Sequence, residues 1–171
     1  LGCYYITIES QKDRIRRRQL KDSDKNVIDH LPLLNDGAEV HTAVDEGALK
    51  IHDRIRYRNP DYQRDTYYGI KDKSVIETTV GRVFFNEIWP PALGFMNTAV
   101  PKKKLEELIF RCYQISGHAE TVRVLDRLKA LGFEQATLAG VSIGLVDMII
   151  PEEKATIVSD ARRQINDVDA Q

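Results

Sequence analysis

The amino-acid sequence predicts an α+β fold in which a small antiparallel β element is followed by a helical lobe. The first observation is that residues 49–58 alternate mostly apolar with mostly cationic side chains, which is the period of a strand with one buried face. The second is a run rich in β-branched residues, 75–85, which predicts a returning strand. The third is that apolar residues beyond Pro101 recur every three or four positions, as on one face of a helix.

Turn-forming residues frame the β element. Residues 59–61, Asn-Pro-Asp, close the first strand, and the polar, tyrosine-rich stretch 61–74 is predicted to be a hairpin loop. A short helix is predicted upstream at about 39–47, and another after the second strand, ending at Trp89. The opening residues 1–7 are apolar and β-prone.

The second half of the chain is predicted to be helical. A first helix begins at Pro101, which suits a first helical position, and ends at Gly117. A second covers about 119–131, with residues 132–133 as a left-handed cap and apolar clasp. A third begins at Pro151 and carries a narrow apolar seam with coiled-coil spacing, which needs a partner helix. The seam consists of Val158, Ala161, Ile165 and Val168.

Composition and charge exclude several classes of protein. The formal net charge of −1 gives no global attraction to polyanions, so any contact with nucleic acid must come from local patches. No apolar run reaches the roughly 18–20 residues that span a bilayer, and no signal-peptide pattern opens the chain, which favours a cytoplasmic protein without membrane contacts. Cys3 and Cys112 are predicted to be reduced and partly buried. The apolar start at Leu1, without an initiator Met, is typical of a cut inside a longer polypeptide.

No motif of an independent enzyme is present. The sequence has no phosphate loop, GxGxxG, HExxH or CxxC, and its serines lack the context of a nucleophile elbow. A two-metal phosphoryl-transfer site needs several carboxylates on rigid backbone, whereas Asp22 and Asp24 lie in a charged connector. We therefore expect no catalytic and no metal-binding residue in this chain. His52 is expected to be solvated or hydrogen-bonded rather than a ligand.

Three cationic features are candidates for anion contacts. Lysines 102–104 stand at a predicted helix N-terminus, where the helix dipole favours anions, so they form either an anion site or a solvated face. Arg82 follows Gly81, where a missing side chain allows either a ligand or packed backbone to approach closely. The arginines of the charged stretch 9–26 form either a phosphate-binding arm or a solvated connector. They are Arg14, Arg16, Arg17 and Arg18.

Six segments stand in one order along the chain. They are LGCYYIT (1–7), GALKIHDRIRYR (47–58), ETTVGRVFFNEIWP (77–90), KKKLEELIFRCYQISG (102–117), ETVRVLDRLKALGF (120–133) and ATLAGVSIGLVDMIIPEEK (136–154). Together they resemble the largest catalytic subunit (β′) of bacterial DNA-directed RNA polymerase. Each segment alone is weakly specific, whereas six in the order of that family are strongly specific.

The resemblance implies a place within that enzyme. In the family, the segment that starts here at Leu1 follows a loop whose three aspartates bind Mg²⁺, so the metal would be bound upstream and this chain would hold no cofactor. Residues 1–100 would form a pore-type α+β region and residues 101–171 a helical funnel region. Both line the secondary channel, through which nucleotides reach the active site and the RNA 3′ end leaves on backtracking.

The resemblance also implies partners. The helix predicted from Pro151 resembles the first of two rim helices, where secondary-channel factors dock. The other implied partners are the β, α and ω subunits, the DNA template and the RNA product, in the cytoplasm at the nucleoid. The alternatives are a free-standing module that binds the polymerase and a small nucleic-acid-binding protein.

Five residues are singled out by the resemblance. Lys102, Lys103 and Arg82 are candidate contacts for nucleotide or RNA in the channel. Asp147 and Met148 are a candidate structural elbow that fixes the direction of the rim helix. The family has Asp-Asp-Met and Gly-Lys-Lys where this chain has Val-Asp-Met and Pro-Lys-Lys, so the lysines carry over while the paired acids and the flexible glycine do not.

Overall fold

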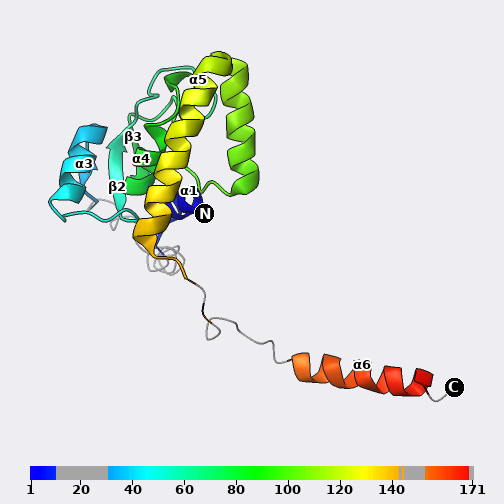
Figure 1. Cartoon of the computed structure of the whole chain (residues 1–171). Coiled ribbons are helices and arrows are strands. Elements are labelled where there is room, and N and C mark those ends of the chain that lie inside the picture. The colour runs from blue at the N-terminus through cyan, green and yellow to red at the C-terminus, as the bar shows by residue number, and fades with distance from the viewer. Residues whose placement is uncertain (11–30, 143, 145–152, 170–171) are drawn as a thin grey trace. The chain divides into compact units, whose positions relative to one another are not determined.

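The computed structural model describes residues 1–10, 31–142, 144 and 153–169, and it confirms the predicted α+β class. The chain forms two compact units, Leu1–Gly140 and Val141–Gln171 (Figure 1). The elements in chain order are α1 (Gly2–Thr7), β1 (Leu33–Leu34), α3 (Gly37–Asp45), β2 (Arg54–Arg58), β3 (Val75–Thr79), α4 (Val80–Asn86), the 3-10 turn η3 (Pro91–Leu93), α5 (Lys102–Ala139) and α6 (Lys154–Asp169).

The sheet has the strand order β1-β2-β3. β2 and β3 run antiparallel with Ile55 opposite Thr78, which confirms the predicted hairpin. Ile55 and Tyr57 are buried while Arg54 and Arg56 are half-buried, as the alternation predicts. β1 pairs with β2 in parallel through only two residues, too few for a sequence period to reveal.

Both predicted strands are longer than the observed ones. β2 covers only the end of the predicted strand 49–58, and β3 stops at Thr79, where the prediction continued to residue 85. The cause at β3 is local, because the side-chain oxygen of Thr79 accepts a hydrogen bond from the backbone N–H of Arg82 and caps a helix. The β-branched run therefore becomes one strand followed directly by α4.

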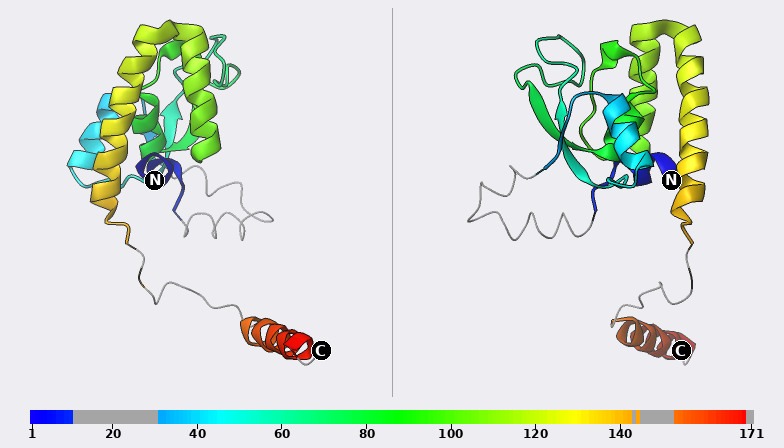
Figure 2. Two further views of the ribbon diagram at one scale, coloured as in Figure 1. Left: turned by 45° about the vertical axis from the view of Figure 1, so that its right-hand side comes forward. Right: turned by 90° about the vertical axis from the view of Figure 1, so that its left-hand side faces the viewer.

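Two clusters of buried side chains form the core of the first unit. α3 covers one of them and the two arms of α5 cover the other, with α4 shared between the clusters (Figures 1 and 2). The cluster between α1, α4 and α5 contains Cys3, Ile6, Phe85, Trp89, Leu93, Met96, Val100, Leu108, Cys112, Val124 and Leu128. The cluster between α3, the sheet and α4 contains Val40, Ile55, Tyr57, Ile76, Val80, Val83 and Phe95.

The opening residues form a helix, so the β tendency of 1–7 was misleading. α1 buries Cys3 and Ile6, three positions apart on one helical face, against α4 and α5. Its backbone lies close to that of α4. A Cβ atom on Gly81 would stand only 2.0 Å from the carbonyl oxygen of Ile6, so a side chain does not fit there. Tertiary packing of this kind outweighs a propensity difference of about 1 kcal/mol.

α5 is a helical hairpin whose two arms lie side by side (Figures 1 and 2). The predicted stop at Gly117 is confirmed, since this residue interrupts the helix with φ 76° and ψ −179°. The predicted cap at residues 132–133 is wrong, because the second arm continues to Ala139 and ends at Gly140, which has φ 56°. Gly132 instead lies where α1 crosses α5, and a Cβ there would be 3.1 Å from the Cys3 sulfur.

The second unit contains α6. The predicted start of this helix at Pro151 lies outside the described residues, and Lys154 is the first helical residue described. Among the described side chains of α6, the large apolar ones are exposed, namely Ile157, Val158 and Ile165. Of the helices described, none has the length and apolar character needed to cross a membrane. The packing units divide after Gly140, and the division into functional regions at residue 100 stays a prediction.

Candidate functional site

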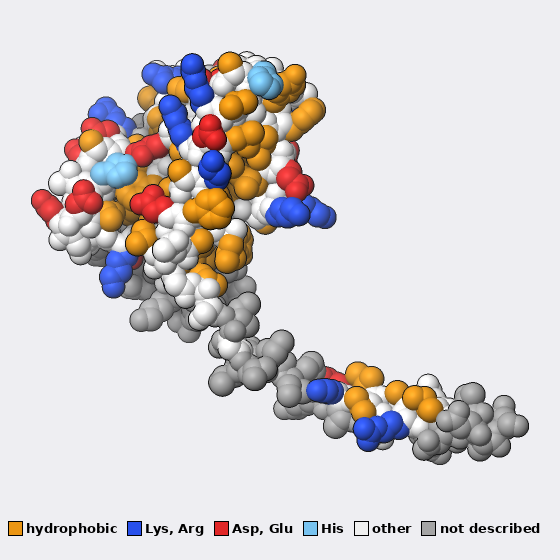
Figure 3. Space-filling view, in the orientation of Figure 1, with side chains coloured by type: hydrophobic (Ala, Val, Ile, Leu, Met, Phe, Trp, Pro, Cys, Tyr) orange, Lys and Arg blue, Asp and Glu red, His pale blue; other side chains and the backbone are white. Residues whose placement is uncertain are grey.

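The lysine triplet lies at the N-terminus of the first arm of α5. Lys102 and Lys103 are exposed and Lys104 is half-buried. Lys102 stands 4.0 Å from Glu106 at 90% side-chain exposure, a contact too solvated to neutralise it, and Lys104 donates to Thr98 over 2.6 Å. Within the described part of the chain, Lys103 has no ion-pair partner. Lys and Arg side chains gather on the surface where α5 begins (Figure 3).

This helix start is open, unlike the starts of α3 and α4, which have side-chain caps. Asp36 caps α3 by accepting from Glu39 N–H, and Thr79 caps α4. α5 has Pro101 at the capping position, with no side-chain cap and no acid in its first turn. Its first backbone hydrogen bond runs from Leu105 to Pro101, so the N–H groups of lysines 102–104 lack helical partners. Open N–H groups and ammonium groups together make a local positive potential.

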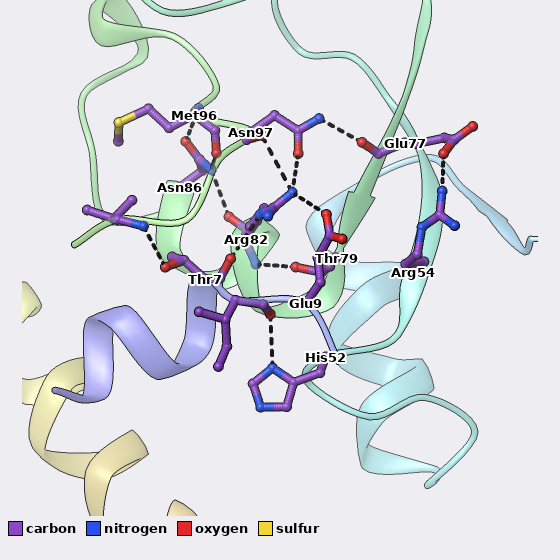
Figure 4. A network of polar contacts seen from close by, with 12 residues as sticks. Thr7, Glu9, His52, Arg54, Glu77, Thr79, Arg82, Asn86, Met96 and Asn97 are labelled. Carbon is purple, nitrogen blue, oxygen red and sulfur yellow. Dashed lines mark hydrogen bonds and ion pairs between the residues drawn. The ribbon is translucent and has the colours of Figure 1, made fainter. Parts of the chain in front are cut away.

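Arg82 lies in the interior, unlike the lysines. It is only 8% exposed, and its Nε donates to the carbonyl oxygen of Thr7 over 3.0 Å. Its Nη1 donates to the Asn97 side chain over 3.2 Å and lies 3.3 Å from a Glu9 carboxylate oxygen (Figure 4). A guanidinium with this many protein acceptors holds elements of the fold together.

Two neighbouring tyrosines, Tyr67 and Tyr68, contact the first arm of α5. The Tyr68 hydroxyl donates to a Glu107 carboxylate oxygen over 3.1 Å, and the Arg111 guanidinium carbon lies 4.8 Å from the centre of the Tyr67 ring. Burial, followed by the hydrogen bond and charge of Glu107, raises the pKa of Tyr68 to about 12. The loop 61–74 that was predicted as a hairpin connector is therefore also a support for α5.

The structure also tests the predictions made for His52 and for the two cysteines. His52 is hydrogen-bonded as predicted, with Nδ1 3.1 Å from the carbonyl oxygen of Ile8. Cys3 and Cys112 are free, as predicted, but they are buried rather than partly buried. The elbow residues Asp147 and Met148 and the arginines of 14–18 lie outside the described residues.

The described residues provide no set of side chains that could bind a metal ion. No three His, Cys, Asp or Glu side chains among the described residues lie close enough together to hold a metal ion. The described residues therefore offer no ligand set for Mg²⁺.

The polar side chains that fix the segment leading into α5 were not predicted from the sequence. Thr7, Asn86 and Asn97 each bond backbone groups far away in the sequence. A single Thr or Asn in a sequence gives no sign of a long-range contact, because such residues are equally common in turns and on surfaces. The one available sign was Gly81, whose absent side chain admits the α1 backbone beside Arg82.

Comparisons with known proteins agree with the resemblance. The profile of the family described as RNA polymerase Rpb1, domain 3, matches residues 1–148. The DNA-directed RNA polymerase subunit beta' of Methylacidiphilum infernorum is 48% identical over 171 residues, which is 100% of this chain and 12% of that protein. The same subunit of Opitutus terrae is also 48% identical over the same shares of both chains. That of Chlamydia felis is 44% identical over 136 residues, 77% of this chain and 10% of that protein.

The first two relatives match the whole chain, which corresponds to only 12% of their own length. The family profile covers the whole first unit, including α1, the sheet, α4 and both arms of α5. The chain therefore belongs to the RNA polymerase Rpb1, domain 3 family and corresponds to a segment of the bacterial β′ subunit.

Proposed function

We propose that this chain lines the secondary channel of a DNA-directed RNA polymerase, where it guides nucleotides inward and holds the RNA 3′ end after backtracking. The proposal rests on the family to which the chain belongs and on one structural observation, the open cationic start of α5. The match of all 171 residues to part of much longer β′ sequences speaks against a free-standing module.

The chemistry of the ligand fits this helix start. A nucleoside triphosphate and an RNA backbone are both polyanions, which exposed ammonium groups and open N–H groups attract. Lys102 and Lys103 stand at the end of the first arm that lies away from the Gly117 bend. We assign direct anion contact to these two lysines and an indirect part to Arg82.

The remaining roles follow from the same assignment. Nucleotidyl transfer would be carried out by the whole enzyme, with Mg²⁺ held by carboxylates elsewhere in β′ and with this chain as a wall of the channel. The β, α and ω subunits, template DNA and RNA would be its partners in the cytoplasm. α6 would receive secondary-channel factors at the rim, with Asp147 and Met148 as the elbow that directs it.

The test is a pair of substitutions, Lys102→Ala with Lys103→Ala, placed in the whole polymerase. Loss of two positive charges at the channel should raise the apparent KM for nucleotides on the order of threefold to tenfold at low salt, and the effect should shrink as salt screens the charges. Lys129→Ala is the matched control, since this lysine is an exposed residue of the second arm of α5 whose ion-pair partner among the described residues is its neighbour Asp126. A KM equal to that of the control across the salt series would overturn the proposal.

A further inference from the structure

The lead-in segment, residues 96–100, connects the end of the α4 region to α5 and has no regular secondary structure. It is nevertheless fixed by polar contacts along its length. Asn86 accepts from the backbone N–H of Met96 over 2.7 Å and donates to its carbonyl oxygen over 3.0 Å. At the far end, the Thr7 hydroxyl oxygen accepts from the backbone N–H of Val100 over 3.0 Å.

Asn97 lies near the start of the lead-in segment and joins three parts of the fold. Its side-chain oxygen accepts from Arg82 over 3.2 Å, and its side-chain nitrogen donates to the carbonyl oxygen of Glu77 in β3 over 2.6 Å (Figure 4). Asn97 is half-buried, so these bonds are partly shielded from water.

Arg82 binds α1 and the lead-in segment at the same time. The same guanidinium that contacts Asn97 donates to the carbonyl oxygen of Thr7 at the end of α1. Glu9, 14% exposed, lies 3.3 Å from it and balances its charge in the interior. Gly81 makes this geometry possible, because any side chain there would collide with the α1 backbone at Ile6.

The lead-in segment runs directly into Pro101 and the first turn of α5. A segment without secondary structure has many accessible conformations, each of which would send the helix start to a different place. Side-chain bonds from α1, β3 and α4 select one of them. The position of the lysine triplet is thus set by residues far away in the sequence.

We propose that Arg82 is a positioning residue which, with Thr7, Asn86 and Asn97, fixes the lead-in segment and so places Lys102 and Lys103 in the channel. Arg82 acts through these neighbours and makes no contact with nucleotide or RNA. The nucleotide part of this inference rests on the proposed function, whereas the ordering of the lead-in segment does not.

The first experiment measures the ordering in the chain itself. Asn97→Ala removes the side-chain bonds to Arg82 and Glu77 without placing a new charge in the core, and it leaves the backbone carbonyl of residue 97, which also accepts from Arg82 over 3.5 Å. Hydrogen exchange of the amides in 98–105 should become faster on the order of tenfold, while the amides of α3 stay as they were. Asn35→Ala is the matched control, because it also deletes asparagine side-chain bonds, but to Glu39 in α3. Unchanged exchange in 98–105 would overturn the inference.

The second experiment asks in whole polymerase whether the effect passes through the lysines. Asn97→Ala should raise the nucleotide KM by about twofold to fivefold with kcat unchanged, since it weakens a binding contact and leaves the chemical step alone. In a Lys102→Ala, Lys103→Ala background the same change should have no further effect on KM, because coupled residues are not additive. Equal effects in both backgrounds, or a fall in kcat alone, would overturn the positioning role.

The two experiments separate the possible failures. Faster exchange in Asn97→Ala together with a normal KM in the double-lysine variant would leave the lead-in segment as described and refute the channel assignment. A raised KM in the double-lysine variant with a normal KM in Asn97→Ala would refute the positioning role. Arg82→Lys adds a test of the guanidinium itself, as it keeps the charge but loses the fork that reaches Thr7 and Asn97 together, and it should match Asn97→Ala in both measurements.

Discussion

Gly2 and Gly132 touch through their backbones where α1 crosses the second arm of α5. A Cβ atom on Gly2 would lie 1.9 Å from the carbonyl oxygen of Gly132 and 3.0 Å from the backbone nitrogen of Ala136. These are backbone atoms inside a helix, so neither can move aside without shifting the helix. The contact explains how a helix of six residues is held in the first core cluster.

Gly2→Ala should therefore destabilise the chain by about 1–3 kcal/mol through overpacking, although alanine is the better helix former. Gly37→Ala is a matched control at the first position of α3, where the nearest atom to the new Cβ would be the flexible carboxylate end of Glu87. That variant should stay within about 1 kcal/mol of the parent chain. Urea unfolding followed by circular dichroism measures both, and equal midpoints for the two variants would contradict the crossing.

Tyr68 should lose its proton at a higher pH than an ordinary tyrosine. Its pKa is raised to about 12 from the ordinary 10.0, chiefly by burial and then by Glu107, so the fold favours the neutral phenol. The contribution of this contact to stability is complete below pH 10 and is lost as the pH rises from 10 through 12. Burial raises the pKa of Tyr57 as well, so tyrosinate absorbance should show late components from both residues among the seven tyrosines. The part due to Tyr68 should be absent in Tyr68→Phe and shifted to lower pH in Glu107→Gln. A titration that Glu107→Gln leaves unaltered would refute the assigned cause.

The seam of α6 should need a partner helix. Val158 and Ile165 are exposed, and a stripe this narrow cannot bury itself. The chain as given should fray beyond about Asp160 or self-associate through the seam. Light scattering and protease resistance of the last turns would be compared with those of a chain extended through the second rim helix that the resemblance implies. Val158→Glu with Ile165→Glu should abolish self-association, and an extension that changes neither measurement would remove the physical support for a rim helix.

The isolated chain should not polymerise nucleotides. Transfer of a nucleotidyl group needs metal-binding carboxylates that converge on rigid backbone, and the described residues contain no such group. Purified chain with Mg²⁺, a template and triphosphates should give no template-dependent extension above a no-protein blank. Whole polymerase assayed alongside is the positive control, and extension by the chain alone would place catalysis within it.

Local sequence patterns predicted one part of the site and not the other. Lysines 102–104 and the start of their helix were predicted, because a proline followed by charged and periodic apolar residues is a local signal. The interior position of Arg82 was not predicted, since burial depends on Thr7, Glu9 and Asn97, which lie up to 75 residues away in the sequence. No period or motif relates such residues to one another.

By itself the sequence determined the class of the fold, the β2–β3 hairpin, the bend at Gly117 and the family, because each depends on neighbouring residues or on the order of segments. Only the tertiary structure decided that residues 2–7 are helical and that α5 continues past Gly132. The reason is the same in both cases. A local preference for a strand, or for a glycine stop, is weak, and the burial of apolar side chains and the close backbone packing where α1 crosses α5 outweigh it.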